Sequence, residues 1–190
     1  MVNLENYTQE KLTIDIVKAN VYGVLILIPI ALLYGLPYFL IWGNETNASG
    51  LKEMARFAGG LLILVSLAGG IVLHELIHGI VWACCAKKGF KSIRFGVLWK
   101  LVTPYCHCSE PLKVKHYMLG AIMPAVILGF LPAIIAIVIG NLLLLIFAVF
   151  FTMAAIGDFM IINLIRKEEM NTLVLDHPSE AGCYVYRKIE

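Results

Sequence analysis

The chain has 190 residues, of which 60% are hydrophobic and only 15% are charged, and its formal net charge is +2. Soluble domains are nearer half apolar and a quarter charged, so this composition argues against an ordinary soluble domain. The apolar residues are gathered into long runs, which indicates that lipid is the solvent for much of the chain.

Four apolar runs are long enough to cross the hydrocarbon core of a bilayer, which takes about 20 helical residues. They lie at residues 21–42, 57–86, 117–140 and 142–165. The first run follows a mixed-charge segment and is longer than the apolar region of a signal peptide, so we interpret it as an uncleaved span. We therefore predict an all-α polytopic membrane protein with four transmembrane helices, forming a single membrane-embedded domain over residues 1–190.

The second span contains the sequence HELIH, in which His74 and His78 are four residues apart. On a helix this spacing places both imidazoles on one face, one turn apart, where they can share a zinc ion. Glu75 lies beside them and can act as a general base on water. Ionisable side chains are costly within a membrane, which favours a metal site over two satisfied histidines and a salt-bridged glutamate.

The loop at 87–116 is predicted to contribute a strand to a small β-hairpin, because apolar and polar residues alternate from Ile93 to Leu101, before Pro104. In one interpretation the hairpin lies on the membrane surface, with Trp99 at the interface. In the other, it is an edge strand that holds an extended substrate by strand addition.

The chain has five cysteines, an odd number, so a complete set of intramolecular disulfides is excluded. The cysteines fall in or near the half of the chain that we place toward the cytoplasm, where free thiols are expected. Cys106, His107 and Cys108 form a CHC sequence that is either a turn with buried thiols or a metal-binding segment.

The fourth span carries a single charge, Asp158. His78 lies nine residues before Lys87, and Asp158 lies eight residues before Arg166. At 1.5 Å per residue, these separations place them about 13 Å and about 12 Å inside the same boundary. Because catalytic zinc usually takes three protein ligands, we predict that Asp158 joins His74 and His78 as the third ligand.

The basic residues predict the orientation of the four spans. Both termini, the loop at 87–116 and the tail at 166–190 lie on one side, which holds thirteen of the fifteen Lys and Arg residues. The other side has only Lys52 and Arg56. The positive-inside rule therefore predicts a multi-pass protein of the cell membrane with both termini in the cytoplasm.

Three stretches of the sequence resemble a known family: HELIHG in the second span, YCHCSEPLKVKHYMLG leading into the third, and GDFMII in the fourth. They resemble the putative zincin peptidases formerly grouped as DUF3267. More distantly, the layout is similar to the site-2-type intramembrane metalloproteases, which pair a His-Glu-x-x-His helix with an aspartate from a later span. The resemblance implies zinc-dependent hydrolysis of peptide bonds, with His74, His78 and Asp158 as ligands and Glu75 as base.

Together these observations predict a zinc-dependent, membrane-embedded metalloprotease that acts near the cytoplasmic face of the membrane. Its expected partners are a membrane-protein or peptide substrate and the lipid bilayer, with no nucleic acid. The alternative is a non-hydrolytic membrane zinc-binding or zinc-transfer protein, which explains the histidines and Asp158 but leaves Glu75 without a role. A structural membrane protein with a buried polar cluster would need no metal.

Overall fold

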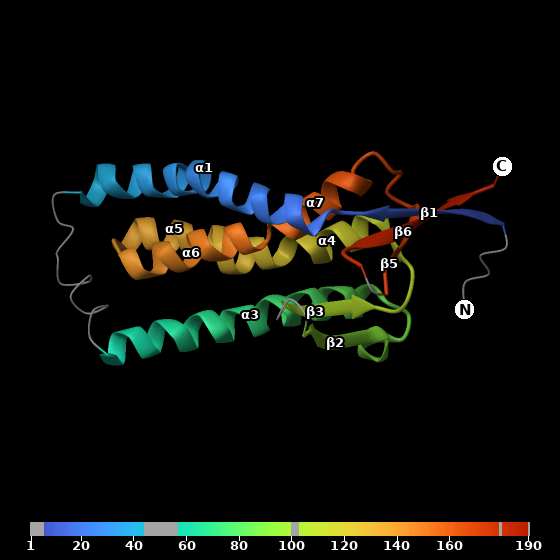
Figure 1. The fold of residues 1–190 in the computed structure, drawn as a ribbon, viewed down its shortest axis with the longest axis horizontal. Helices are drawn as coiled ribbons and strands as arrows, with labels where there is room; N and C mark the ends of the chain where they lie inside the picture. The colour runs from blue at the N-terminus through green and yellow to red at the C-terminus, as the bar shows by residue number, and fades with distance from the viewer. Residues whose placement is uncertain (1–5, 44–56, 100–102, 179, 190) are drawn as a thin grey trace. The chain divides into compact units, whose positions relative to one another are not determined.

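The structure is a computed structural model that describes residues 6–43, 57–99, 103–178 and 180–189 (Figure 1). Its helical segments are α1 (Ile16–Trp42), α3 (Phe57–Cys85), a 3₁₀ turn (Gly89–Ser92), α4 (Val114–Pro124), a π-helical segment (Ala125–Phe130), α5 (Leu131–Ile139), α6 (Leu142–Ala154) and α7 (Ile156–Ile165). Its strands are β1 (Tyr7–Thr13), β2 (Ile93–Leu98), β3 (Thr103–Cys108), β4 (Leu112–Lys113), β5 (Leu173–Asp176) and β6 (Gly182–Lys188). Lys52 and Arg56, predicted to lie in the outer loop, fall outside the described residues.

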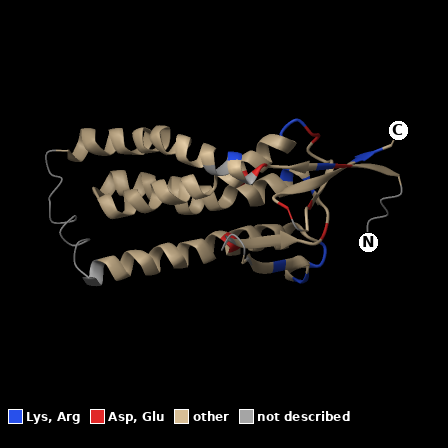
Figure 2. Ribbon diagram, in the orientation of Figure 1, with Lys and Arg blue, Asp and Glu red and all other residues tan. Residues whose placement is uncertain are grey.

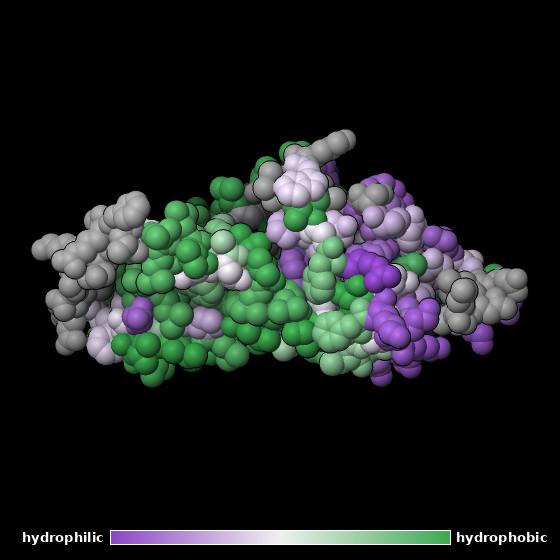
Figure 3. Space-filling model, turned by 90° about the horizontal axis from the view of Figure 1, so that it is seen from below, coloured by the Kyte–Doolittle hydropathy of each residue, from purple (hydrophilic) through white to green (hydrophobic). Residues whose placement is uncertain are grey.

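Four helical stretches are long and apolar enough to cross a membrane, at Val21–Trp42, Gly60–Cys85, Val114–Ile139 and Leu142–Ile165. This confirms the four predicted spans to within three residues at each end. Their charged residues are few, as the sparse colouring of the long helices in Figure 2 shows. Large apolar side chains are exposed along α1 and α3, and hydrophobic residues dominate the long helical part of the face that Figure 3 shows. Such surfaces are suited to contact with lipid.

Two of the spans are not uniform α-helices. The third passes through α4, the π-helical segment and α5, and Pro124 and Pro132 lie in this stretch. Proline lacks a backbone N–H and disturbs the regular hydrogen-bond ladder. The fourth is divided into α6 and α7 at Ala155, so that α7 begins only two residues before Asp158.

The all-α part of the fold prediction is wrong, because six strands form two antiparallel sheets (Figure 1). One sheet has the strand order β1-β6-β5-β4, and the other contains β2 and β3. Strand β1 pairs along its whole length with β6, from Tyr7↔Lys188 to Thr13↔Gly182. The two segments come from opposite ends of the chain, so neither sequence indicates its partner, and strand preference depends strongly on such tertiary context.

The four-stranded sheet joins the N-terminal segment, the end of the loop before α4, and the C-terminal tail. These contribute β1, β4, and the pair β5 and β6, respectively. Hydrogen-bonded strands cannot lie on opposite sides of a bilayer, so the three segments share one side of any membrane that the spans cross. That this side is the cytoplasm stays a prediction.

The predicted hairpin is present as β2 and β3, with Ile93 opposite Cys108 and Val97 opposite Pro104. The predicted end of the strand is wrong: β2 ends at Leu98, and Pro104 lies inside β3, where a two-stranded sheet provides an edge position that tolerates proline. The predicted positions at residues 100–102 fall outside the described residues. The hairpin lies against α3 at Gly79, where an added Cβ would come within 2.5 Å of the Phe95 ring.

The chain divides into two compact units, which we describe separately; the single-domain organisation stays a prediction. The first unit comprises residues 1–20, 75–123 and 156–190, and the second comprises residues 21–74 and 124–155. The core of the first brings together buried residues of α3, the hairpin, α4, α7 and the larger sheet, including Trp82, Tyr117, Ile165, Val174 and Val185.

In the second unit, α1, α5 and α6 pack through a core that includes Ile30, Tyr34, Tyr38, Ala136 and Ala148. Two hydrogen bonds from aromatic side chains hold α1 to the end of α5. The Tyr38 hydroxyl donates to the Gly140 carbonyl at 2.8 Å, and the Trp42 indole donates to the Ile137 carbonyl at 2.8 Å. Gly140 has a φ of 70°, a left-handed conformation that favours glycine where α5 ends.

Candidate metal centre

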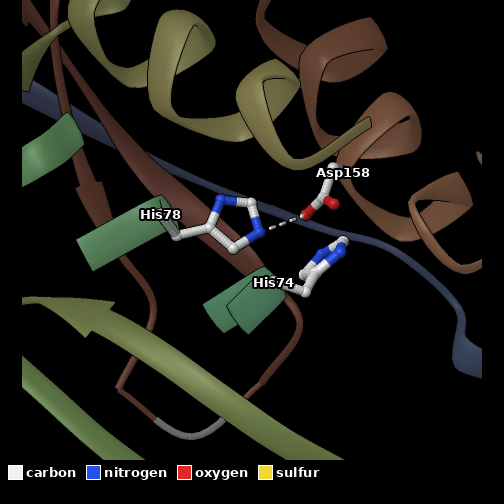
Figure 4. Close-up of side chains that lie close together, drawn as sticks. All are labelled: His74, His78 and Asp158. Atoms are coloured by element: carbon white, nitrogen blue, oxygen red, sulfur yellow. Dashed lines mark ion pairs between the residues drawn. The ribbon is translucent and has the colours of Figure 1, made fainter. Parts of the chain in front are cut away.

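His74, His78 and Asp158 lie together, although Asp158 is 80 residues beyond His78 in the sequence (Figure 4). Each offers one ligand atom, and these atoms all lie within 4.8 Å of one another. Both histidines are buried, with exposed fractions of 8% and 4%. His74 ends the first segment of the second unit, residues 21–74, but it is one turn before His78 in the unbroken helix α3, so helix geometry sets their spacing.

Asp158 lies in the first turn of α7, because the fourth span is divided at Ala155. An acidic side chain near a helix N-terminus is favourable, since the backbone N–H groups there are not bonded within the helix. His78 is seven residues before the end of α3 at Cys85, and Asp158 is seven residues before the end of α7 at Ile165. Both are therefore about 10 Å of helix from those ends.

The ring of His78 has a defined role for each nitrogen. Its Nδ1 lies 2.8 Å from the carbonyl oxygen of Gly120 in α4. A carbonyl only accepts, so Nδ1 carries the proton and donates it. Its Nε2 lies 3.4 Å from Asp158 Oδ1 (Figure 4). This is the arrangement of a ligating histidine, in which a bond at one nitrogen orients the other toward a metal.

Aromatic rings hold His78 from the side of the larger sheet. The His78 ring stacks on Trp82, with centroids 5.1 Å apart, and Trp82 stacks in turn on Tyr117, with centroids 5.2 Å apart. The indole N–H of Trp82 donates to the Tyr117 carbonyl at 3.1 Å. Gly120 permits this close approach, because an added Cβ would lie 2.0 Å from the Trp82 indole nitrogen. The sequence analysis missed the roles of Trp82, Tyr117 and Gly120. The i, i+4 spacing of His78 and Trp82 could have indicated the contact between these two residues.

Glu75, the predicted base, is half-buried in α3. Burial raises the pKa of the Cys106 thiol, and the negative charge of Glu75 raises it further, so the Glu75 carboxylate lies within electrostatic range of β3. Adjacent residues differ in direction by about 100° around a helix. The side chain of Glu75 therefore leaves the helix in a different direction from that of His74. The role of Glu75 as the base stays a prediction.

The CHC segment does not gather into a second site: among the residues that the structure describes, His74, His78 and Asp158 form the one group of three or more possible metal ligands. The five cysteines are free thiols. Burial raises the pKa of Cys108 to about 11 and that of Cys183 to about 12, so both stay protonated at neutral pH. The interpretation of CHC as a turn with buried thiols is correct for the thiol of Cys108, whose exposed fraction is 1%, but not for the turn, because these residues lie in strand β3 and Cys106 is only half-buried.

The donor set fits zinc. Two imidazoles and one carboxylate are a known ligand combination of catalytic zinc, and they leave a position for water. The orientation of His78 by Gly120 adds the outer hydrogen bond that such ligands usually have.

Comparison with known protein families gives one match, which covers the candidate metal centre. The profile of the DUF3267 family, described as "Putative zincin peptidase", matches residues 67–173. That range includes His74, Glu75, His78 and Asp158. No curated protein and no solved structure matches the chain.

Proposed function

The chain belongs to the DUF3267 family of putative zincin peptidases, and on that premise we propose that it is a membrane-embedded zinc metalloprotease that cleaves peptide bonds near the cytoplasmic face. The observation that carries this proposal is the convergence of His74, His78 and Asp158 to within 4.8 Å inside two apolar spans. Ionisable side chains are costly within a span, and two imidazoles with one carboxylate at this spacing are a donor set of catalytic zinc.

In this proposal the two histidines and Asp158 hold the zinc. Bound zinc supplies a Lewis acid and lowers the pKa of water toward neutrality. Glu75 accepts a proton from the attacking water and delivers it to the nitrogen of the leaving amine. The orientation of His78 is held by Gly120 while Glu75 transfers the proton, because the Nδ1–H of His78 donates a hydrogen bond to the Gly120 carbonyl.

The proposed cytoplasmic position follows from the distribution of charge. Both terminal segments belong to one hydrogen-bonded sheet, which supports a position on the same side of the membrane, and the predominance of Lys and Arg on that side supports a cytoplasmic assignment. His78 and Asp158 are about 10 Å from the helix ends that face this side. Peptide bonds that reach this depth are the proposed substrates.

Both interpretations of the hairpin remain proposals. Trp99 is 81% exposed and Phe95 is 51% exposed, as expected of aromatic residues at a membrane interface. Each of β2 and β3 also has one edge unpaired within its two-stranded sheet, and an extended substrate could add there as a third strand.

The substitution Glu75→Gln tests the enzymatic proposal, because it removes the base while the three proposed ligands remain. A protease should retain the zinc content of the wild type and lose turnover by about 10²–10⁴-fold. Membrane proteomes of cells carrying the wild type or Glu75→Gln would identify the substrate as a protein that accumulates with the variant. If Glu75→Gln restores every phenotype of a deletion, the protein is a zinc carrier and not a hydrolase.

A further inference from the structure

Asp176 at the end of β5 is a buried carboxylate outside the proposed ligand set, with an exposed fraction of 8%. The backbone N–H of Cys108 in β3 donates to its Oδ2 at 2.7 Å, and the Tyr117 hydroxyl of α4 donates to its Oδ1. His107 Nδ1 lies 3.8 Å from Oδ2. One side chain of the C-terminal tail therefore connects the hairpin to the third span.

The contacts of Asp176 continue to the proposed metal ligand His78. Tyr117 stacks on Trp82, and Trp82 stacks on His78, with interplanar angles of 20° and 17°. The Trp82 indole also bonds to the Tyr117 backbone. Tyr117 and Trp82 are 2% and 5% exposed, so neither ring has room to turn without displacing the other. All these residues belong to the first unit.

Burying the carboxylate of Asp176 between the sheet and α4 carries a free-energy cost. Burial raises the pKa of Asp176, while the bonds from Cys108 and Tyr117 and the charges of His107 and His78 oppose the rise. An ionised group is costly to bury. Here the two hydrogen bonds reach separate oxygens of the carboxylate, whereas an asparagine in its place would offer only one oxygen as an acceptor.

We propose that Asp176 is a positioning residue for the metal centre, which fixes the ring of His78 through Tyr117 and Trp82. In this proposal the buried carboxylate of the C-terminal tail determines how well His78 is oriented before the metal binds. This inference rests on the proposed function, in that it requires the His74–His78–Asp158 cluster to bind zinc.

The substitution Tyr117→Phe tests this role, because it keeps the stacked ring and removes only the hydroxyl that donates to Asp176. Zinc affinity is measured on purified full-length protein in mild detergent, by competition with a fluorescent chelator. We expect a loss of about 10-fold, the lower end of the effect of removing an outer-shell partner of a metal ligand. The absorption spectrum of the Co²⁺-loaded protein should change as well, because it reports the geometry of the ligands.

Tyr38→Phe is the matched control. It also removes a hydrogen-bonded hydroxyl from a buried tyrosine, but Tyr38 belongs to the second unit and its hydroxyl donates to the Gly140 carbonyl. It should lower thermal stability and leave zinc affinity and the Co²⁺ spectrum unchanged. The double variant combines Tyr117→Phe with Asp176→Asn. Because the two residues act in series, it should lose no more zinc affinity than the single variant with the larger loss.

The outcomes separate the two proposals. If the wild type binds no zinc stoichiometrically, the proposed function fails and the positioning role fails with it. If the wild type binds zinc and Tyr117→Phe binds it equally well, with only the stability loss of Tyr38→Phe, the metal site stands and the role of Asp176 is overturned. Independent, additive losses in the double variant would also overturn it.

Discussion

Gly120 is the position where one added methyl group should damage both the fold and the metal centre. The carbonyl of Gly120 accepts a hydrogen bond from the Nδ1–H of His78, and the absence of a Cβ at Gly120 leaves room for Trp82. In Gly120→Ala the new Cβ would lie 2.0 Å from the indole Nε1 and 2.2 Å from Cδ1. Trp82 is held between the rings of His78 and Tyr117, so the clash must move either the indole or α4.

The expected magnitude follows from these contacts. Overpacking a filled core costs about 1–3 kcal/mol. Displacing the indole also breaks its hydrogen bond to the Tyr117 carbonyl, which adds about 0.5–1.5 kcal/mol. We therefore expect Gly120→Ala to reduce the free energy of unfolding by about 1.5–4.5 kcal/mol in total. Because the bond that orients His78 is disturbed, zinc affinity should fall about 10–100-fold.

The assay compares thermal unfolding and zinc competition of detergent-purified wild type, Gly120→Ala and Gly69→Ala. Gly69 is the matched control, since it lies in α3 and an added Cβ there meets no atom within 4 Å. Alanine is the better helix former, so Gly69→Ala should be neutral or stabilising by up to about 1 kcal/mol. If Gly120→Ala unfolds at the same temperature as the wild type and binds zinc as tightly, the packing argument for His78 is refuted.

Three further predictions concern the metal, the topology and acid stability. Wild-type protein should carry about one zinc ion per chain, and His78→Ala should lose most of it; unchanged metal content by elemental analysis would contradict the ligand set. Reporter fusions after Lys52 and after Lys100 should report opposite sides of the membrane, and the same side for both would contradict four spans. Hydrogen bonding to Arg187 lowers the pKa of Glu168 from its usual 4.5, so this pair stabilises the fold above that pH and the contribution is lost as pH falls through the lowered value. Glu168→Gln should therefore show a flatter loss of melting temperature below pH 4.5 than the wild type, and equal slopes would exclude the pair as a source of acid sensitivity.

The clustering of the three proposed ligands could largely be predicted, because each is marked by a simple feature of its own span. The HELIH spacing places His74 and His78 on one helical face whatever surrounds them. Asp158 is the single charged residue of an apolar span, and counting residues to the nearest basic boundary placed it at the depth of His78. Helix rise converts sequence distance into depth, so within a membrane this part of the tertiary arrangement can be inferred from sequence.

The rest was decided by contacts between distant segments. β1 and β6 form a sheet because the two ends of the chain meet, and no periodicity in either segment identifies its partner. The support of His78 also depends on Gly120 and Tyr117 of α4, which reach His78 and Trp82 only because α3 and α4 lie within contact distance. The sequence alone therefore determined the spans and the proposed ligands, through hydrophobicity and helical repeat. Only the tertiary structure decided the sheet and the packing around His78, because both depend on which surfaces the folded chain brings together.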